Sequence, residues 1–285
     1  MIVLPWLEIA VLGLLLLAVA CLAGLRRRGV QPRREWRLVQ ATRVLGLVGG
    51  LAAAYSIAGR SEYGRGEMLA PSIFGLVVLV AVAIGETVVR PARPSGPRSA
   101  SLRTRAIGDY LPRWPSRAML GTGLVLLATL TLTTVTAARD ETSRAMRVLA
   151  CDAGGVAEAR GPYPGSFYSL PLASVLVIVL LVAALSARQV VRRPRGFAET
   201  DAGDDALRRR SLTVIVAATG VAFAFSHFGI AMTAAAALVG LGSCSPVWAA
   251  PLGWLIGVSA LPALLIGIWS LVRIVSSDRP ERSWS

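Results

Sequence analysis

Long uncharged runs alternate with short arginine-rich stretches along most of the 285-residue chain. A hydrocarbon core of about 30 Å requires roughly 20 apolar residues in a helix that rises about 1.5 Å per residue. Seven runs reach that length, and each predicts a membrane-spanning helix. They cover residues 2–25, 38–58, 69–89, 116–138, 169–187, 212–238 and 247–272. The pattern therefore predicts an all-α fold, a polytopic transmembrane helix bundle of about seven spans that forms one domain over residues 1–285.

Positive charge is distributed unevenly among the stretches that separate these runs. All 30 cationic residues are arginine, and the formal net charge is +14. Twenty-four arginines lie in four stretches and six in two others, and the two classes alternate along the chain. The rich stretches are 26–43, 90–117, 188–210 and 273–282, and the poor ones are 60–65 and 139–160. Because cytoplasmic loops carry the excess of arginine, we expect the N-terminus outside, the C-terminus in the cytoplasm, and an extracytoplasmic loop at 139–168.

The same charge is also typical of nucleic-acid binding, but its alternation with apolar runs favours membrane topology. The expected partner of the arginines is therefore the anionic headgroups of the lipid bilayer, with no nucleic acid. The chain is 54% hydrophobic, contains no lysine and is rich in Ala, Val, Gly and Leu, as in a high-GC bacterium. We expect a multi-pass protein of the bacterial plasma membrane.

Several chemistries are excluded by residues that the sequence lacks. Without lysine there is no Walker A lysine and no Schiff base for pyridoxal phosphate or retinal. The single histidine excludes a HExxH zinc site and a bis-histidine haem. The polar stretches between runs are too short for an independently folded domain. We expect no cofactor, and ATP-driven activity would need a separate ATP-binding subunit.

His227, Glu86 and Glu8 lie within predicted spans, and such ionisable residues are functional candidates by their position. His227, in the outer half of the sixth span, is either a functional group or a neutral imidazole hydrogen-bonded to a neighbouring helix. Glu86 precedes Arg90 by four residues, a spacing that favours an ion pair on the helix over a proton relay. Glu8 lies close enough to the outer boundary of the first span to reach water.

Three aspartates, Asp201, Asp204 and Asp205, form an acidic cluster in a predicted inner stretch. Clustered carboxylates can hold Mg²⁺ against a diphosphate, as in membrane prenyltransferases, which makes these residues weak metal candidates. Asp204 and Asp205 also precede Arg208 and Arg209 by four residues, a spacing typical of salt bridges at the start of a helix. The second interpretation is preferred, and no metal site is predicted.

Two cysteines, Cys151 and Cys244, both lie outside in the predicted topology, where oxidising conditions favour a disulfide between them. Cys21 is membrane-embedded and is interpreted as a small apolar residue. The outer segment 161–168 contains two prolines and three aromatic residues. That segment is either an outward recognition surface or an interfacial anchor for the fifth span.

Small and polar residues recur at helical spacing within several spans. Gly46 and Gly50 in the second span, and Gly253 and Gly257 in the seventh, are each four residues apart. Small residues at this spacing let helix backbones approach closely in lipid, so we expect helix packing at these sites. A stripe of threonines in the fourth span either lines a cavity or hydrogen-bonds across helices. Its members are Thr129, Thr133 and Thr136.

Four short segments carry a resemblance to other membrane proteins. They read CDAG at 151–154, RGPYPGSFYS at 160–169, DYLPR at 109–113 and DDALRRR at 204–210. With these segments the chain resembles an uncharacterised family of multi-pass integral membrane proteins, of about seven spans, from high-GC Gram-positive bacteria. The resemblance covers most of the chain. It implies the architecture and assigns no activity, so no site residue follows from it.

The sequence favours a non-enzymatic membrane subunit of a transport or envelope-stress system whose ATPase is a separate chain. One alternative is an intramembrane enzyme that acts on a lipid or prenyl diphosphate through the cluster around Asp204. Another is a membrane sensor that detects its signal through the outer loop. No catalytic residue is predicted.

Overall fold

The structure is a computed structural model that describes residues 34–60, 62–88, 106–139, 146–153, 155–193 and 201–276. Six helices in this part of the chain are long and apolar enough to cross a membrane. They are α2 (Arg34–Ala58), α3 (Arg65–Val88), α4 (Arg113–Thr136), α5 (Ser166–Arg192), α6 (Asp201–Val239) and α7 (Ala249–Val275). Each corresponds to one of the predicted spans two to seven. The first predicted span, with Glu8 and Cys21, lies outside the described residues, so the total of about seven stays a prediction.

Short turns, a proline and acidic residues mark the starts of three helices. A 3-10 turn, η1 (Glu62–Gly64), precedes α3, and a second one, η2 (Ile107–Asp109), lies shortly before α4. α6 has Asp201 and Asp204 in its first turn, where carboxylates offset the positive end of the helix dipole. α4 begins directly after Pro112, a residue that cannot donate a backbone hydrogen bond.

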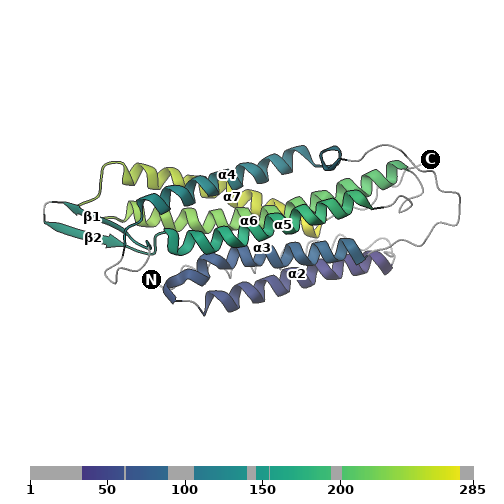
Figure 1. Cartoon of the computed structure of the whole chain (residues 1–285), viewed down its shortest axis with the longest axis horizontal. Helices are drawn as coiled ribbons and strands as arrows, with labels where there is room; N and C mark the ends of the chain where they lie inside the picture. The colour runs from purple at the N-terminus through teal and green to yellow at the C-terminus, as the bar shows by residue number, and fades with distance from the viewer. Residues whose placement is uncertain are drawn as a thin grey trace.

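Consecutive helices run in opposite directions, which gives an elongated bundle with two distinct ends (Figure 1). We call one the hairpin end, because it carries two short strands together with the α2–α3 and α6–α7 connections. We call the other the arginine end. It carries the first turns of α2, α4 and α6 and the last turns of α3, α5 and α7. Described arginines there include Arg43, Arg113, Arg117, Arg188, Arg192, Arg193, Arg208, Arg209, Arg210 and Arg273.

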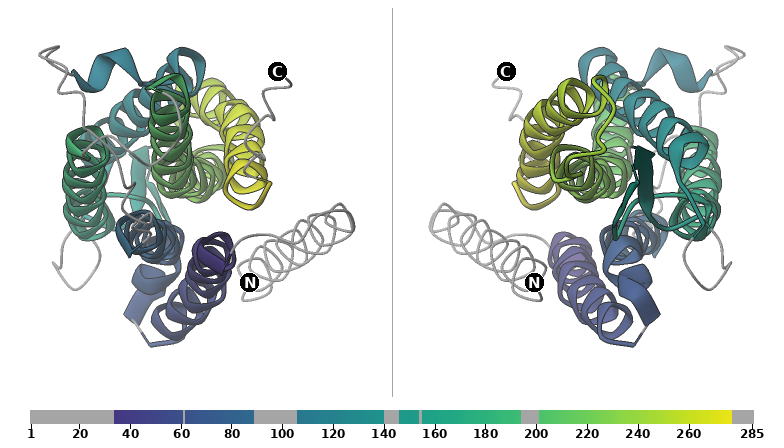
Figure 2. Two further views of the ribbon diagram at one scale, coloured as in Figure 1. Left: turned by 90° about the vertical axis from the view of Figure 1, so that its right-hand side faces the viewer. Right: turned by 90° about the vertical axis from the view of Figure 1, so that its left-hand side faces the viewer.

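Helix α6 forms the centre of the bundle. It packs against α3, α4, α5 and α7, whereas α2 packs mainly against α3 at the edge (Figure 2). In its apolar stretch 89% of the residues are buried, against 28–50% in the other five helices. Ala218, Val221 and Ala222 of α6 are fully buried, because alanine and valine let surrounding helices approach closely. The main core therefore follows α6 along the bundle.

Large apolar side chains cover the outside of the other helices. On α5, Leu170, Val177, Leu181 and Leu185 are 55–66% exposed. The outer face of α7 shows the same pattern with Trp254, Leu255, Val258, Leu261 and Leu265. Continuous apolar surface of this kind marks a binding patch on a soluble protein, but it is the ordinary outer face of a helix in lipid. The architecture fits a multi-pass membrane protein.

The four glycines that sequence singled out lie at close helix–helix contacts. A Cβ atom added at Gly46 would lie 2.5 Å from a side-chain atom of α3, and one at Gly50 would lie 3.0 Å from another. On α7, added Cβ atoms at Gly253 and Gly257 would lie 2.8 Å and 3.3 Å from side chains of α6. Larger residues would therefore push these helix pairs apart.

The expected all-α fold needs one correction, because the predicted outer loop contains a β-hairpin. Strands β1 (Leu149–Ala153) and β2 (Val156–Arg160) pair antiparallel, with Leu149 opposite Arg160. Gly155 in the turn has a φ of +79°, a left-handed conformation that glycine adopts without strain. Sequence patterns did not predict these strands, which are five residues long, mostly exposed and without alternating burial.

Candidate functional site

A buried carboxylate near the arginine end of α3 collects partners from three other parts of the chain. Glu86 Oε1 accepts a hydrogen bond from Arg43 Nη2 at 2.8 Å, and Oε2 accepts one from the Ser211 hydroxyl at 2.5 Å. The Arg193 guanidinium lies 3.8 Å from Oε2 and also donates to the Glu86 backbone carbonyl. We call Arg43, Glu86, Arg193 and Ser211 the Glu86 network. It joins α2, α3, the residue after α5, and α6.

Arg43 is the most unexpected member of this network. Only 1% of the residue is exposed, although it lies within a helix that can cross the membrane. Its Nη1 donates to the backbone carbonyl of Ile274 in α7 at 3.2 Å. A guanidinium buried this deeply requires a carboxylate and further acceptors to offset its desolvation. In the sequence, Arg43 belongs to the arginine-rich stretch 26–43 and was therefore grouped with the arginines that flank spans. Its position inside the predicted span 38–58 could have indicated a buried partner.

The predicted ion pair of Glu86 with Arg90 stays a prediction. Arg90 lies outside the described residues, and the described partners of Glu86 come from elements distant in the sequence. Burial lowers the pKa of Arg193 from its ordinary value, against the opposing effect of the Glu86 carboxylate. Arginine nevertheless stays protonated, so Glu86 sits between two cationic side chains as a structural counter-ion.

A second set of bonds extends this network to the segment before α4. The Arg208 guanidinium donates to Asp205 Oδ1 and to the Arg193 backbone carbonyl, both at 3.1 Å. The Tyr110 hydroxyl donates to the same Asp205 oxygen at 3.1 Å. Polar contacts thus run from Tyr110 through α6 to Glu86, and onward through Arg43 to α7.

The acidic cluster forms the start of α6 and does not gather into a ligand set. Asp205 pairs with Arg208, three residues on, where the sequence predicted pairing four residues on. Asp204 is 3% exposed, and Asp201 is exposed in the first turn. Among the described residues, no group of three or more His, Cys, Asp or Glu side chains is placed to hold a metal ion. The arrangement matches the helix-start interpretation more closely than a magnesium site.

His227 packs in the centre of the bundle and bonds to the neighbouring helix. It is 1% exposed, and its Nε2 lies 2.9 Å from the Ser259 hydroxyl of α7. The Ser259 hydroxyl also donates to the Ile256 carbonyl, so the serine accepts from the imidazole. The structure therefore presents the hydrogen-bonded imidazole that was one of the two alternatives for this residue.

A disulfide joins the hairpin to the α6–α7 connection. Cys151 of β1 is bonded to Cys244, and their Cα atoms are 5.7 Å apart. Beside it, Glu158 Oε1 accepts hydrogen bonds from the backbone amide and the hydroxyl of Ser243, each at 3.4 Å. The backbone at Gly242 lies so close to the Glu158 carboxylate that an added Cβ atom would overlap it. One covalent bond and one carboxylate thus hold the hairpin against the end of α6.

The segment 161–168 proves to be an anchor rather than an exposed surface. Tyr163 is fully buried and Tyr168 is 2% exposed. The Tyr163 hydroxyl lies 2.7 Å from that of Thr136, and the Thr133 hydroxyl donates to the Pro164 carbonyl at 2.7 Å. Burial raises the pKa of Tyr163, an effect only partly opposed by its hydrogen bond to Thr136. Two members of the threonine stripe, Thr133 and Thr136, therefore hold this segment by hydrogen bonds, whereas Thr129 bonds within its own helix.

Sequence analysis missed a stacked arginine at the α2–α3 turn. The guanidinium carbon of Arg147 lies 3.5 Å from the centroid of the Tyr63 ring. Tyr63 has a φ of +57°, uncommon for a residue with a side chain, and its carbonyl accepts from the Tyr168 hydroxyl at 2.7 Å. A cation–π contact and a hydrogen bond thus hold this conformation. Nothing in the spacing of the sequence brings 63, 147 and 168 together.

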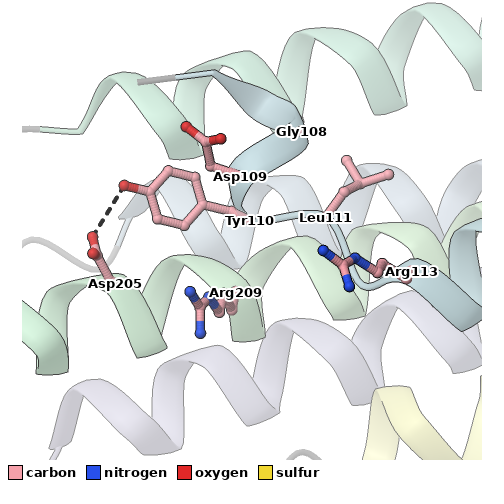
Figure 3. Close-up of a pocket in the computed structure, with 7 residues that line it drawn as sticks. All are labelled: Gly108, Asp109, Tyr110, Leu111, Arg113, Asp205 and Arg209. Carbon is pink, nitrogen blue, oxygen red and sulfur yellow. Dashed lines mark hydrogen bonds between the residues drawn. The ribbon is translucent and has the colours of Figure 1, made fainter. Parts of the chain in front are cut away.

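A surface hollow of about 310 Å³ lies at the arginine end, between η2 and the first turns of α4 and α6. Figure 3 shows the side chains around it, with Tyr110 bonded to Asp205. Its lining residues are Gly108, Asp109, Tyr110, Leu111, Arg113, Asp205 and Arg209. The hollow brings four charged side chains together.

Comparison of the chain with protein-family models, curated proteins and solved structures finds no significant match. The resemblance noted in the sequence therefore stays a prediction. Within the described residues, six helices fit a multi-pass membrane protein, and several ionisable side chains at the arginine end bond to one another. These bonds join separate helices.

Proposed function

We propose that this protein is a non-enzymatic subunit of a bacterial plasma-membrane complex for transport or envelope stress, and that a separate chain supplies ATP hydrolysis. In this proposal the arginine end lies in the cytoplasm and the hairpin end outside. The distribution of arginine supports that orientation. So does the disulfide between Cys151 and Cys244, because such bonds persist in oxidising compartments.

The Glu86 network is the observation that carries this proposal. Glu86 accepts hydrogen bonds from Arg43 and Ser211 while Arg193 lies near the same carboxylate. A general base or proton relay must exchange protons with a substrate or with water, whereas this carboxylate is occupied by partners from other helices. The network therefore acts as a joint between helices, as expected of a scaffold subunit.

The competing enzyme hypothesis relies on Asp204 and Asp205 as ligands for a metal–diphosphate complex. Asp205 is engaged by Arg208 and Tyr110, and Asp204 is buried. A diphosphate enzyme would need these carboxylates free to meet Mg²⁺. Their arrangement favours the subunit over the enzyme.

A sensor is the second candidate, and the hairpin is the observation that favours it. The hairpin projects beyond the helices at one end (Figure 1) and is bonded to the segment that follows α6. A ligand that moved β1 and β2 would pull directly on the central helix. The structure thus offers a mechanical route from the outer face to the bundle core.

Gentle detergent extraction followed by mass spectrometry of bound proteins tests the subunit proposal. We expect an ATP-binding protein in stoichiometric amount with the wild-type chain. Recovery of the chain without a protein partner, together with Mg²⁺-dependent turnover of a lipid diphosphate, would contradict it. In that case turnover should disappear with Asp204→Ala and persist with Asp152→Ala, an exposed aspartate at the hairpin end.

Orientation can be tested with two exposed alanines, one at each end. In a background with all three cysteines replaced by alanine, Ala157→Cys lies on β2 and Ala202→Cys lies in the first turn of α6. We expect a membrane-impermeant thiol reagent to label the first variant in intact cells and the second only after permeabilisation. The reverse pattern would place the arginine end outside.

A further inference from the structure

Two tryptophans mark the membrane depth of the hollow at the arginine end. Trp114, in the first turn of α4, is 63% exposed, and its ring lies 5.5 Å from that of Trp269 at an interplanar angle of 75°. The Arg273 guanidinium lies 5.4 Å from the Trp269 ring centroid. Indole rings and snorkelling arginines gather at the headgroup level of a bilayer. The hollow beside Trp114 therefore opens among lipid headgroups.

The cationic groups of the hollow are available, whereas its anionic groups are engaged. Asp205 is held by Arg208 and Tyr110, and Asp109 accepts from the backbone amide of Ala106 at 3.3 Å. No hydrogen bond or ion pair connects the guanidinium groups of Arg113 and Arg209 to any described residue. In Figure 3 the Asp109 carboxylate points away from both guanidinium groups. The two aspartates and two arginines of the lining balance in formal charge, but only the arginines are left with donors that an anion could meet.

The surrounding elements suit a phosphate group attached to an apolar tail. α4 begins beside the hollow without a side-chain cap on its first turn, so the positive end of its helix dipole lies in this region. Leu111 and Pro112 line the adjoining part of the same opening, with Thr213 of α6. Arginine binds phosphate through paired N–H donors, and basic pockets between membrane helices accept lipid headgroups.

We propose that this hollow binds the phosphate of an anionic phospholipid, with Arg113 and Arg209 as its two clamps. The glycerol and the first methylenes of the lipid then pack against Leu111 and Pro112. This inference requires a membrane-embedded chain and no partner protein. It therefore stands or falls independently of the proposed subunit role.

Native mass spectrometry of the full chain in gentle detergent tests the proposal with added phosphatidylglycerol or phosphatidylcholine. We expect the wild type to retain phosphatidylglycerol more tightly. The double variant Arg113→Gln plus Arg209→Gln should weaken that binding about tenfold or more, because it removes two charge-assisted contacts. Both arginines are exposed, so the variant should fold, which unchanged thermal unfolding would verify.

The matched control is Arg188→Gln plus Arg192→Gln, which removes the same charge from exposed positions of α5 at the same end. We expect it to weaken phosphatidylglycerol binding less than about twofold, a general surface-charge effect. Equal losses in the two double variants would overturn the proposal, as would equal retention of the two lipids by the wild type. Displacement of bound lipid by millimolar inorganic phosphate would identify free phosphate as the ligand instead.

Discussion

The two ends of the bundle are held together by different kinds of interaction. At the hairpin end a disulfide joins Cys151 to Cys244, and buried tyrosines bond to neutral oxygens. At the arginine end Glu86 bonds to Arg43 and Asp205 bonds to Arg208. Within the described residues, the first end depends on a covalent bond, hydrogen bonds and the Arg147–Tyr63 cation–π contact, and the second depends on ion pairs. Each end should therefore respond to a different perturbation.

The disulfide restrains the position of the hairpin, whereas the ion pairs at the other end depend on the charge of each partner. A disulfide limits how far the hairpin can move without fixing the charge around it. The Glu86 network places charges from α2, α3 and the residue after α5 close together, so a change in one charge alters the environment of the others. Reduction should loosen one end, and charge removal should loosen the other.

The largest expected effect comes from Glu86→Gln, which leaves Arg43 buried without its anionic partner. Removing one member of a buried ion pair typically costs about 3–5 kcal/mol, because the remaining charge is uncompensated. We expect a loss of about 3 kcal/mol in the free energy of unfolding by sodium dodecyl sulfate, since Glu86 keeps some contact with solvent. Glu67→Gln, at an exposed glutamate of α3, is the control. Equal losses in the two variants would rule out a special role for the network.

Reduction of the disulfide should have the next largest effect, confined to the hairpin end. The bond closes a sequence separation of 93 residues, and disulfides typically contribute about 2–4 kcal/mol. We expect about 2 kcal/mol here, because helix packing persists in the reduced protein. Trypsin should also cleave faster at the exposed Arg160 in Cys151→Ser than in wild type. Unchanged cleavage would show that the Glu158–Ser243 contacts alone hold the hairpin.

High pH should weaken the hairpin end before it weakens the arginine end. Burial raises the pKa of Tyr163 in the folded protein, so the unfolded chain releases this proton first as pH increases. The contribution of the protonated Tyr163 to the free energy of unfolding is complete below the ordinary tyrosine pKa of about 10. It is lost as pH rises through the higher pKa of Tyr163 in the folded protein. The thermal unfolding temperature should fall more steeply in wild type than in Tyr163→Phe. Parallel pH profiles would contradict this expectation.

The smallest expected effect is at His227, whose bond to Ser259 links α6 to α7 at 2.9 Å. Hydrogen bonds between membrane helices contribute about 0.6 kcal/mol on average. Ser259→Ala should therefore lower the free energy of unfolding by about that amount. Ser174→Ala, at an exposed serine that bonds within its own helix, should have less effect. A loss of several kcal/mol at Ser259 would reveal a larger role for this histidine.

Local patterns account for the part of the fold that sequence could predict. Spans two to seven were found because lipid requires about 20 apolar residues per helix, and six of the described helices meet that requirement. Gly46 and Gly253 lie at close helix contacts because small residues four apart form one face of a helix. The pairing of Cys151 with Cys244 followed from their shared side in the predicted topology.

The features that sequence did not predict depend on contacts between distant elements. Arg43 of α2 contacts Glu86 of α3, and Tyr63 in the α2–α3 turn contacts Arg147 in the segment before β1. No spacing rule applies to pairs of this kind, because three-dimensional packing decides them. The hairpin was missed because its strands are only five residues long and mostly exposed. The hollow with Arg113 and Arg209 likewise combines residues from separate segments.

The central position of α6 has a consequence for the order of assembly. α3, α4 and α5 precede α6 in the chain, and all three pack against it. During synthesis these helices enter the membrane while the space for α6 is still filled by lipid or by one another. Core contacts of Phe74, Leu126 and Leu172 can form fully only after α6 arrives. The early helices must therefore rearrange late in biogenesis, and substitutions in α6 should impair assembly as much as stability.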